Sequence, residues 1–137
     1  MAMVLAARWM QAVLAGAACL TMAGAPPAHA QGYPNQSVKI VVPFVAGGGV
    51  DQVARIIAPK LSDVLGQPIV IENRGGAGAS IGAAAVASSP PDGYTLLMGT
   101  GSTHGTNSSV YSKLSYDPVR DFVPVVQVTT SPLVLIV

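Results

Sequence analysis

The stretch Val38–Arg55 constrains the fold of this chain more than any other part of it. Val38–Val42 is short and rich in β-branched residues, which predicts a buried strand. Pro43–Val50 is rich in glycine, and Asp51 stands where the N-cap of a following helix is expected. A strand, a glycine loop and a helix N-terminus together present free N–H groups to an anion. An ordinary tight turn capped by Asp51 would give the same pattern.

Residues 1–30 have the features of a secretory signal peptide. Arg8 supplies the positive charge, Trp9–Ala23 the apolar stretch, and Ala28-His29-Ala30 the small-x-small cleavage site. The apolar stretch is short for a membrane span of about 20 residues, which disfavours a membrane anchor. We therefore expect cleavage after Ala30 and a mature chain that begins at Gln31.

Length and charge exclude several classes of function. The chain has 137 residues, enough for one domain or part of one. Of the seven Lys and Arg residues one, Arg8, lies in the predicted signal peptide, which leaves six against six Asp and Glu. This balance disfavours nucleic acid and anionic membranes as partners. Cys19, the single cysteine, precedes the cleavage site, so neither a disulfide nor a thiolate metal site is expected in the mature chain.

Apolar residues spaced by four, four and three predict a helix over Gln52–Leu65. The stripe expected to face a sheet contains Val53, Ile57, Leu61 and Val64. Pro59 predicts a bend or an early break in this helix, and Gly66 is suited to the position that follows its end.

Further strands and helical runs alternate along the chain. The other predicted strands are Ile69–Glu72, Tyr94–Gly99, Val125–Thr130 and Leu133–Val137. A small-residue helix is predicted over Ile81–Ser88, and polar or glycine-rich loops over Asn73–Ser80 and Thr100–Ser109. This order indicates an α/β fold with a mostly parallel sheet flanked by helices. The three loops follow strands, so they should meet at the carboxyl edge of the sheet, where ligands bind in such folds.

Other chemistries have weaker support in the sequence. The glycines around Gly78 do not complete a dinucleotide motif, and His104 has no clustered ligand for a metal. Gly78–Gly82 does fit the G-x-S-x-G motif of serine hydrolases, with Ser80 as nucleophile and Asp92 and His104 following in order. However, Ser80 lies far beyond its strand, and Asp92 precedes the next strand at the opposite edge of the sheet. A serine hydrolase therefore remains the alternative.

Four motifs then connect the chain to a known family. They are PF-x-x-GG-x-x-D-x-x-AR, GQP-x-x-x-ENR-x-GAG, PDGYTLL and YDP-x-x-DF, in this order between Tyr33 and Val137. In this order the chain resembles the Bug-type extracytoplasmic solute receptors, the substrate-binding proteins of tripartite tricarboxylate transporters. The resemblance implies a type II periplasmic-binding fold with two lobes, no catalysis, no cofactor and no metal. It also implies a periplasmic receptor that captures a small carboxylate, such as a di- or tricarboxylate, and delivers it to membrane permease subunits.

In this family the ligand carboxylate is held mainly by backbone amides and bridging waters. The ligand-binding residues implied for this chain are Phe44, Ala46, Gly47, Gly48, Gly49, Asp51, Gly78, Ala79, Ser80, Ser102, Thr103 and Asn107. We expect Asp51 to cap the helix and to orient amides or a water rather than to read the ligand. Gly49-Val50 and Ala79-Ser80 depart from the polar pairs that the family often has there.

Members of the family are much longer than this chain. The resemblance therefore implies that residues 31–137 form an incomplete first lobe and that the second lobe is missing. A truncated remnant with no binding activity is the third interpretation.

Overall fold

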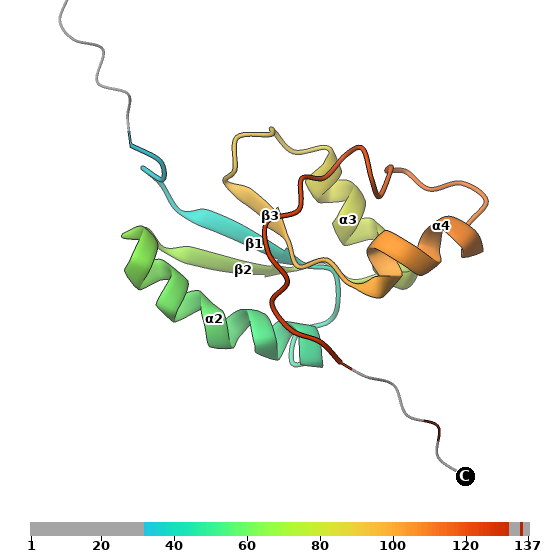
Figure 1. Cartoon of the computed structure of the whole chain (residues 1–137), viewed down its shortest axis with the longest axis horizontal. Coiled ribbons are helices and arrows are strands. Elements are labelled where there is room, and N and C mark those ends of the chain that lie inside the picture. Colours follow the sequence, from blue (N-terminus) through green and yellow to red (C-terminus); the bar gives the residue numbers. More distant parts are fainter. Residues whose placement is uncertain (1–31, 132–134, 136–137) are drawn as a thin grey trace, which may run out of the picture. The chain divides into compact units, whose positions relative to one another are not determined.

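The computed structural model describes residues 32–131 and Leu135 (Figure 1). The described helices and strands all lie within Tyr33–Val137. The predicted signal peptide lies outside the described residues, as does most of the strand predicted at Leu133–Val137. Among the described helices, none is both long and apolar enough to cross a membrane.

Three parallel strands form the sheet in the order β2-β1-β3. They are β1 (Val38–Val42), β2 (Ile69–Asn73) and β3 (Thr95–Leu97). The central strand is the core, since Val38 and Val42 are completely buried. The predicted α/β class with a parallel sheet is confirmed, although β3 is shorter than expected.

The helices cover the two faces of this sheet (Figure 1). Helix α2 (Gly49–Leu65) packs on β2 and β1, whereas α3 (Ser80–Ala87) packs on β3 and β1. The crossover from β1 to β2 and the crossover from β2 past β1 to β3 run in opposite directions along the sheet, and right-handed crossovers of this kind put their helices on opposite faces. A short 3₁₀ turn, η2 (Ala77–Ala79), leads into α3.

Helix α2 differs from its prediction in three ways. It begins at Gly49 with Gly48 as N-cap, so Asp51 is the third helical residue and not the cap. The helix continues through Pro59 to Leu65, so it does not break early. Its end is as predicted, because Gly66 is left-handed (φ 67°) and donates its N–H to the Ser62 carbonyl.

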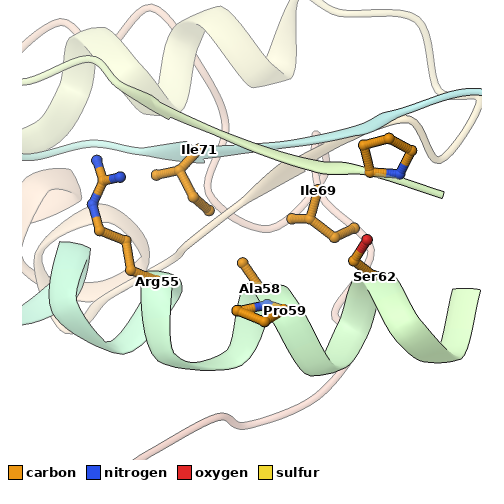
Figure 2. A pocket seen from close by; sticks show the side chains of 7 residues that line it. Arg55, Ala58, Pro59, Ser62, Ile69 and Ile71 are labelled. Carbon is orange, nitrogen blue, oxygen red and sulfur yellow. The ribbon is translucent and has the colours of Figure 1, made fainter.

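The stripe predicted for α2 is also partly wrong. Ala54 and Ala58 are the buried apolar residues of the helix, whereas the Val64 residue is 73% exposed. Small side chains let a helix backbone approach a sheet closely, and Figure 2 shows Ala58 between α2 and the isoleucines of β2.

The segment after β3 was predicted as a loop and is helical instead. A π-helix covers Ser102–Thr106 and continues into α4 (Asn107–Val110). The Thr103 hydroxyl accepts the N–H of Thr100 at 2.8 Å and lies 3.0 Å from its carbonyl, which closes the first turn. Side-chain hydroxyls that bond to nearby backbone stabilise such a turn, which a count of polar residues does not reveal.

The fourth predicted strand, Val125–Thr130, is also wrong. These residues have no strand pairing, and most of their apolar side chains are exposed. β-branched residues favour extended backbone, but a strand forms only where a neighbouring edge accepts its hydrogen bonds.

Gly82 allows α3 to press against the loops that follow β1 and β2. A Cβ at this position would lie 2.7 Å from the Arg74 carbonyl oxygen and 2.8 Å from Pro43 Cα. We predict that Gly82→Ala lowers the free energy of unfolding by about 1–3 kcal/mol, because backbone would have to move. Gly101→Ala is the matched control, since its Cβ would meet nothing within 4 Å and its φ of −54° suits alanine. Urea unfolding measures both variants, and equal stabilities would contradict this packing.

Candidate functional site

The segments that follow the three strands meet at the carboxyl edge of the sheet, as predicted. We call them the first loop (43–48), the second loop (74–79) and the third segment (98–110). The Asn73 side-chain amide donates to the Phe44 carbonyl at 3.2 Å, which joins the first two. The Asn107 amide donates to the Gly78 carbonyl at 2.8 Å and to Ser80 Oγ at 3.1 Å, which joins the last two.

Asp51, in the first turn of α2, holds the first loop in place. Its side chain is almost completely buried, and Oδ2 accepts the N–H of Gly47 and the Nε–H of Arg55, both at 2.8 Å. Oδ1 accepts from the Asn73 amide at 2.9 Å. The hydrogen bond from Arg55, followed by those from Gly47 and Asn73, holds the pKa of the Asp51 carboxyl far below its usual range. The carboxylate is therefore ionised, and both of its oxygens accept hydrogen bonds from protein groups.

Arg55 and Asn73 complete this network, and the sequence analysis gave neither of them a role. Arg55 Nη2 also donates to Asn73 Oδ1 at 3.1 Å, so the three side chains form a closed triangle. The signal for Arg55 was its i,i+4 spacing from Asp51 on one helix, a common arrangement for ion pairs. Asn73 gave no such signal, because its partners lie far from it in sequence.

The start of α2 presents free backbone donors. The first hydrogen bond of the helix joins the Gln52 N–H to the Gly48 carbonyl at 2.9 Å. The N–H groups of Gly49 and Val50 precede this bond, so they have no acceptor within the helix. Gly49 is exposed, and a Cβ there would meet nothing within 4 Å. Gly47 is left-handed (φ 83°) and turns the loop toward the helix. The positive end of the helix dipole adds to these donors, so the arrangement suits an anion.

The second loop is fixed in an unusual conformation. Ala77, Gly78 and Ala79 have φ values of 46°, 62° and 75°. Each alanine in this region costs about 1 kcal/mol or more, so surrounding contacts must hold it there. Ala79 is buried, and the Asn107 amide bonds to the Gly78 carbonyl beside it.

The third segment is anchored by buried polar residues. Thr103 is completely buried, and its hydroxyl bonds to the Thr100 backbone and lies 2.8 Å from His104 Nδ1. The Tyr116 hydroxyl donates to the Thr103 carbonyl at 2.8 Å. Asn107 is buried as well, with its amide on the second loop.

The residues proposed from the sequence thus separate into two groups by burial. Asp51, Thr103 and Asn107 are buried and bond to protein groups, so they position the loops. Ala79 is buried too. The remaining residues are at least partly accessible: Phe44, Ala46, Gly47, Gly48, Gly49, Gly78, Ser80 and Ser102.

The hydrolase alternative is not supported by this geometry. Ser80 Oγ accepts from Asn107, His104 Nδ1 lies against Thr103, and the Asp92 carboxylate accepts the N–H of Tyr94 at the amino end of β3. In the described part of the chain these three side chains have separate partners and form no triad. Residues 32–131 and Leu135 likewise contain no group of three potential metal ligands.

A shallow groove of about 470 Å³ lies elsewhere, between α2 and the outer strand β2 (Figure 2). Ala58, Pro59 and Ser62 line it from the helix, with Ile69 and Ile71 from the strand. Of the residues that line it, only Arg55 belongs to the Asp51 network. The groove is therefore separate from the edge where the three loops meet.

Comparison with known proteins identifies the family. Residues 53–137 match the model of the tripartite tricarboxylate transporter family receptor, TctC, and the chain belongs to this family. It is 43% identical to the protein BugT of Bordetella pertussis over 113 residues, 82% of this chain and 35% of BugT. It is 42% identical to a UPF0065 protein of Pseudomonas sp. (strain P51) over 127 residues, 91% of this chain and 37% of that protein. The chain thus spans about a third of the length of these curated relatives.

Solved structures agree with this assignment. MatC of Rhodopseudomonas palustris with bound malate superimposes with a TM-score of 0.65 and 47% identity, over 67% of this chain and 31% of MatC. R. palustris Rpa4515 with adipate superimposes with a TM-score of 0.61 and 47% identity, over 64% of this chain and 29% of Rpa4515. The confirmed resemblance is therefore one of fold and family.

The Asp51 network predicts a loss of stability in acid. Because the folded pKa lies below the unfolded value of about 3.9, this contribution is complete above that pH and is lost as the pH falls below it. We predict that Asp51→Asn lowers the melting temperature at pH 7 by about 5 °C or more and flattens the acid slope below pH 4. A residual slope remains, because Lys39 lowers the pKa of Glu72 and the Arg120 N–H lowers that of Asp117.

The control for Asp51→Asn is Asp63→Asn, which removes an exposed carboxylate from the same helix. Thermal unfolding between pH 3 and pH 7 compares the melting temperatures of the two variants with that of the original chain. Equal losses in both would show that removal of a charge, and not the network, causes the effect.

Proposed function

We propose that residues 31–137 form one lobe of a periplasmic receptor that captures a small carboxylate for a tripartite tricarboxylate-type transporter. The observation that carries the proposal is the open start of α2, where free N–H groups follow a loop held by buried Asp51. Two related structures, MatC with bound malate and Rpa4515 with adipate, support a di- or tricarboxylate or a similar organic acid as ligand.

The composition of the loops favours recognition by backbone. The first loop, residues 75–80 and the third segment contain no Lys or Arg. Arg55 is paired with Asp51, and Arg74 with Glu72. Amides and hydroxyls therefore supply the attraction for the carboxylate, and a water can bridge at little cost. Such a site accepts several acids that differ beyond the carboxylate group.

The proposed ligand contacts are the accessible members of the loop cluster. In the first loop and the start of α2 these are Gly47, Gly48 and Gly49, flanked by Phe44 and Ala46. Gly78 would contribute from the second loop, Ser80 from the start of α3 and Ser102 from the third segment, whereas buried Ala79 would shape the second loop. We assign Asp51, Thr103 and Asn107 a positioning role, because their polar atoms are bonded to protein.

We also propose a receptor that is not an enzyme and needs no cofactor. Cleavage after Ala30 would release it into the periplasm, where permease subunits would be its partners. In family members of full length, two lobes close on the ligand like a hinged clamp. A lobe that acts alone contributes only its own contacts. We therefore expect a dissociation constant in the millimolar range, which corresponds to a binding free energy of about −4 kcal/mol.

Nuclear magnetic resonance titration with malate and adipate tests the proposal. We expect amide shifts at Gly49 and Val50, whose N–H groups would donate to the carboxylate, and smaller shifts at Gly47, Gly48 and Gly78–Ser80, which lie around the bound acid. The neutral diamides of the same acids are the matched control, and they should leave these amides unchanged. Shifts confined to the groove between α2 and β2, or equal shifts with acids and diamides, would contradict the proposed site.

A second experiment distinguishes two reasons for an absence of binding: the lobe is inactive by itself, or the proposed class of ligand is wrong. A chimera that carries the remaining sequence of MatC after residue 137 should bind malate more tightly than the chain alone, in isothermal titration. Heat with the chimera only would show that this lobe is inactive by itself. No heat with either protein would contradict the ligand class.

A further inference from the structure

Tyr111 follows α4 and lies against the second loop. A Cβ built on Gly78 would stand 2.9 Å from the phenolic oxygen of Tyr111 and 3.4 Å from Asn107 Oδ1. Only a residue without a side chain leaves room for the ring there, and its φ of 62° also favours glycine. The Tyr111 hydroxyl is therefore held at the loop where a ligand carboxylate is proposed to bind.

The hydroxyl of Tyr111 differs from those of the other three tyrosines. Tyr33 donates to the Gly93 carbonyl, Tyr94 to Asn35 Oδ1, and Tyr116 to the Thr103 carbonyl. Within residues 32–131 and Leu135, no protein group bonds to the hydroxyl of Tyr111, and the residue is 38% exposed. Its hydrogen-bonding capacity is thus available at the surface of the site, whereas that of the others stabilises the fold.

We propose that the Tyr111 hydroxyl donates a hydrogen bond to a carboxylate oxygen of the bound acid. This inference rests on the proposed function and adds a side-chain donor to a site otherwise built from backbone amides and small hydroxyls. An O–H donor that meets a carboxylate forms a short, charge-assisted hydrogen bond. Tyr111 would thereby favour acids that reach the second loop while the amides at the start of α2 are also engaged.

The test compares Tyr111→Phe with Tyr33→Phe. Both variants remove one phenolic oxygen, but Tyr33 lies at the amino edge of the sheet, bonded to the residues before β3. Titration of the chain with malate and adipate should show about tenfold weaker binding in Tyr111→Phe and unchanged binding in Tyr33→Phe. The melting temperature of ligand-free Tyr111→Phe should stay within about 1 °C of the original, because no protein bond is lost.

Each alternative outcome has a distinct meaning. Equal affinities of the original chain and Tyr111→Phe would overturn this inference and leave the proposed function intact. A clear fall in the melting temperature of ligand-free Tyr111→Phe would also overturn it, since the hydroxyl would then serve the fold. If only the chimera with MatC responds, the same comparison is made in the chimera, and no response of either protein to the two acids would overturn the proposed function and this inference with it.

Discussion

The proposed site depends on the ion pair between Asp51, which is buried, and Arg55, which is partly exposed. Through the same carboxylate, Asp51 fixes the Gly47 N–H of the first loop and, through Asn73, the end of β2. A buried carboxylate is tolerated only when its oxygens are bonded, and here Gly47, Arg55 and Asn73 donate to it from elements that converge on one edge. The network thus couples the stability of the fold to the shape of the first loop.

That coupling is what would let the proposed site take up an anion without a Lys or Arg side chain aimed at it. The charge of Asp51 is offset by Arg55, while the N–H groups at the start of α2 remain open. Asn107 performs the corresponding task on the other side by tying the second loop to the third segment. Buried polar residues therefore hold the loops, and exposed backbone is left for the ligand, which is consistent with a receptor family whose relatives bind different acids.

The sequence was sufficient for what local pattern determines. The strand at Val38–Val42, the parallel order and the meeting of the loops follow from β-branched runs and βα alternation. It failed where distant contacts decide: Asn73 has partners 22 and 29 residues away, and the Thr103 hydroxyl turns an expected loop into a π-helix. The segment Val125–Thr130 failed for the converse reason, since its pattern favours a strand but no edge pairs with it in the described chain.

The claim that free amides at the start of α2 bind the ligand is tested most directly by Gly49→Pro against Gly49→Ala. Proline suits the first helical position, the extended Gly48 (φ −71°, ψ 165°) suits a residue before proline, and the space around Gly49 is open. The proline variant therefore removes one N–H and keeps the helix. The account predicts malate binding about tenfold weaker in Gly49→Pro and unchanged in Gly49→Ala. Equal affinities in two folded variants would contradict it.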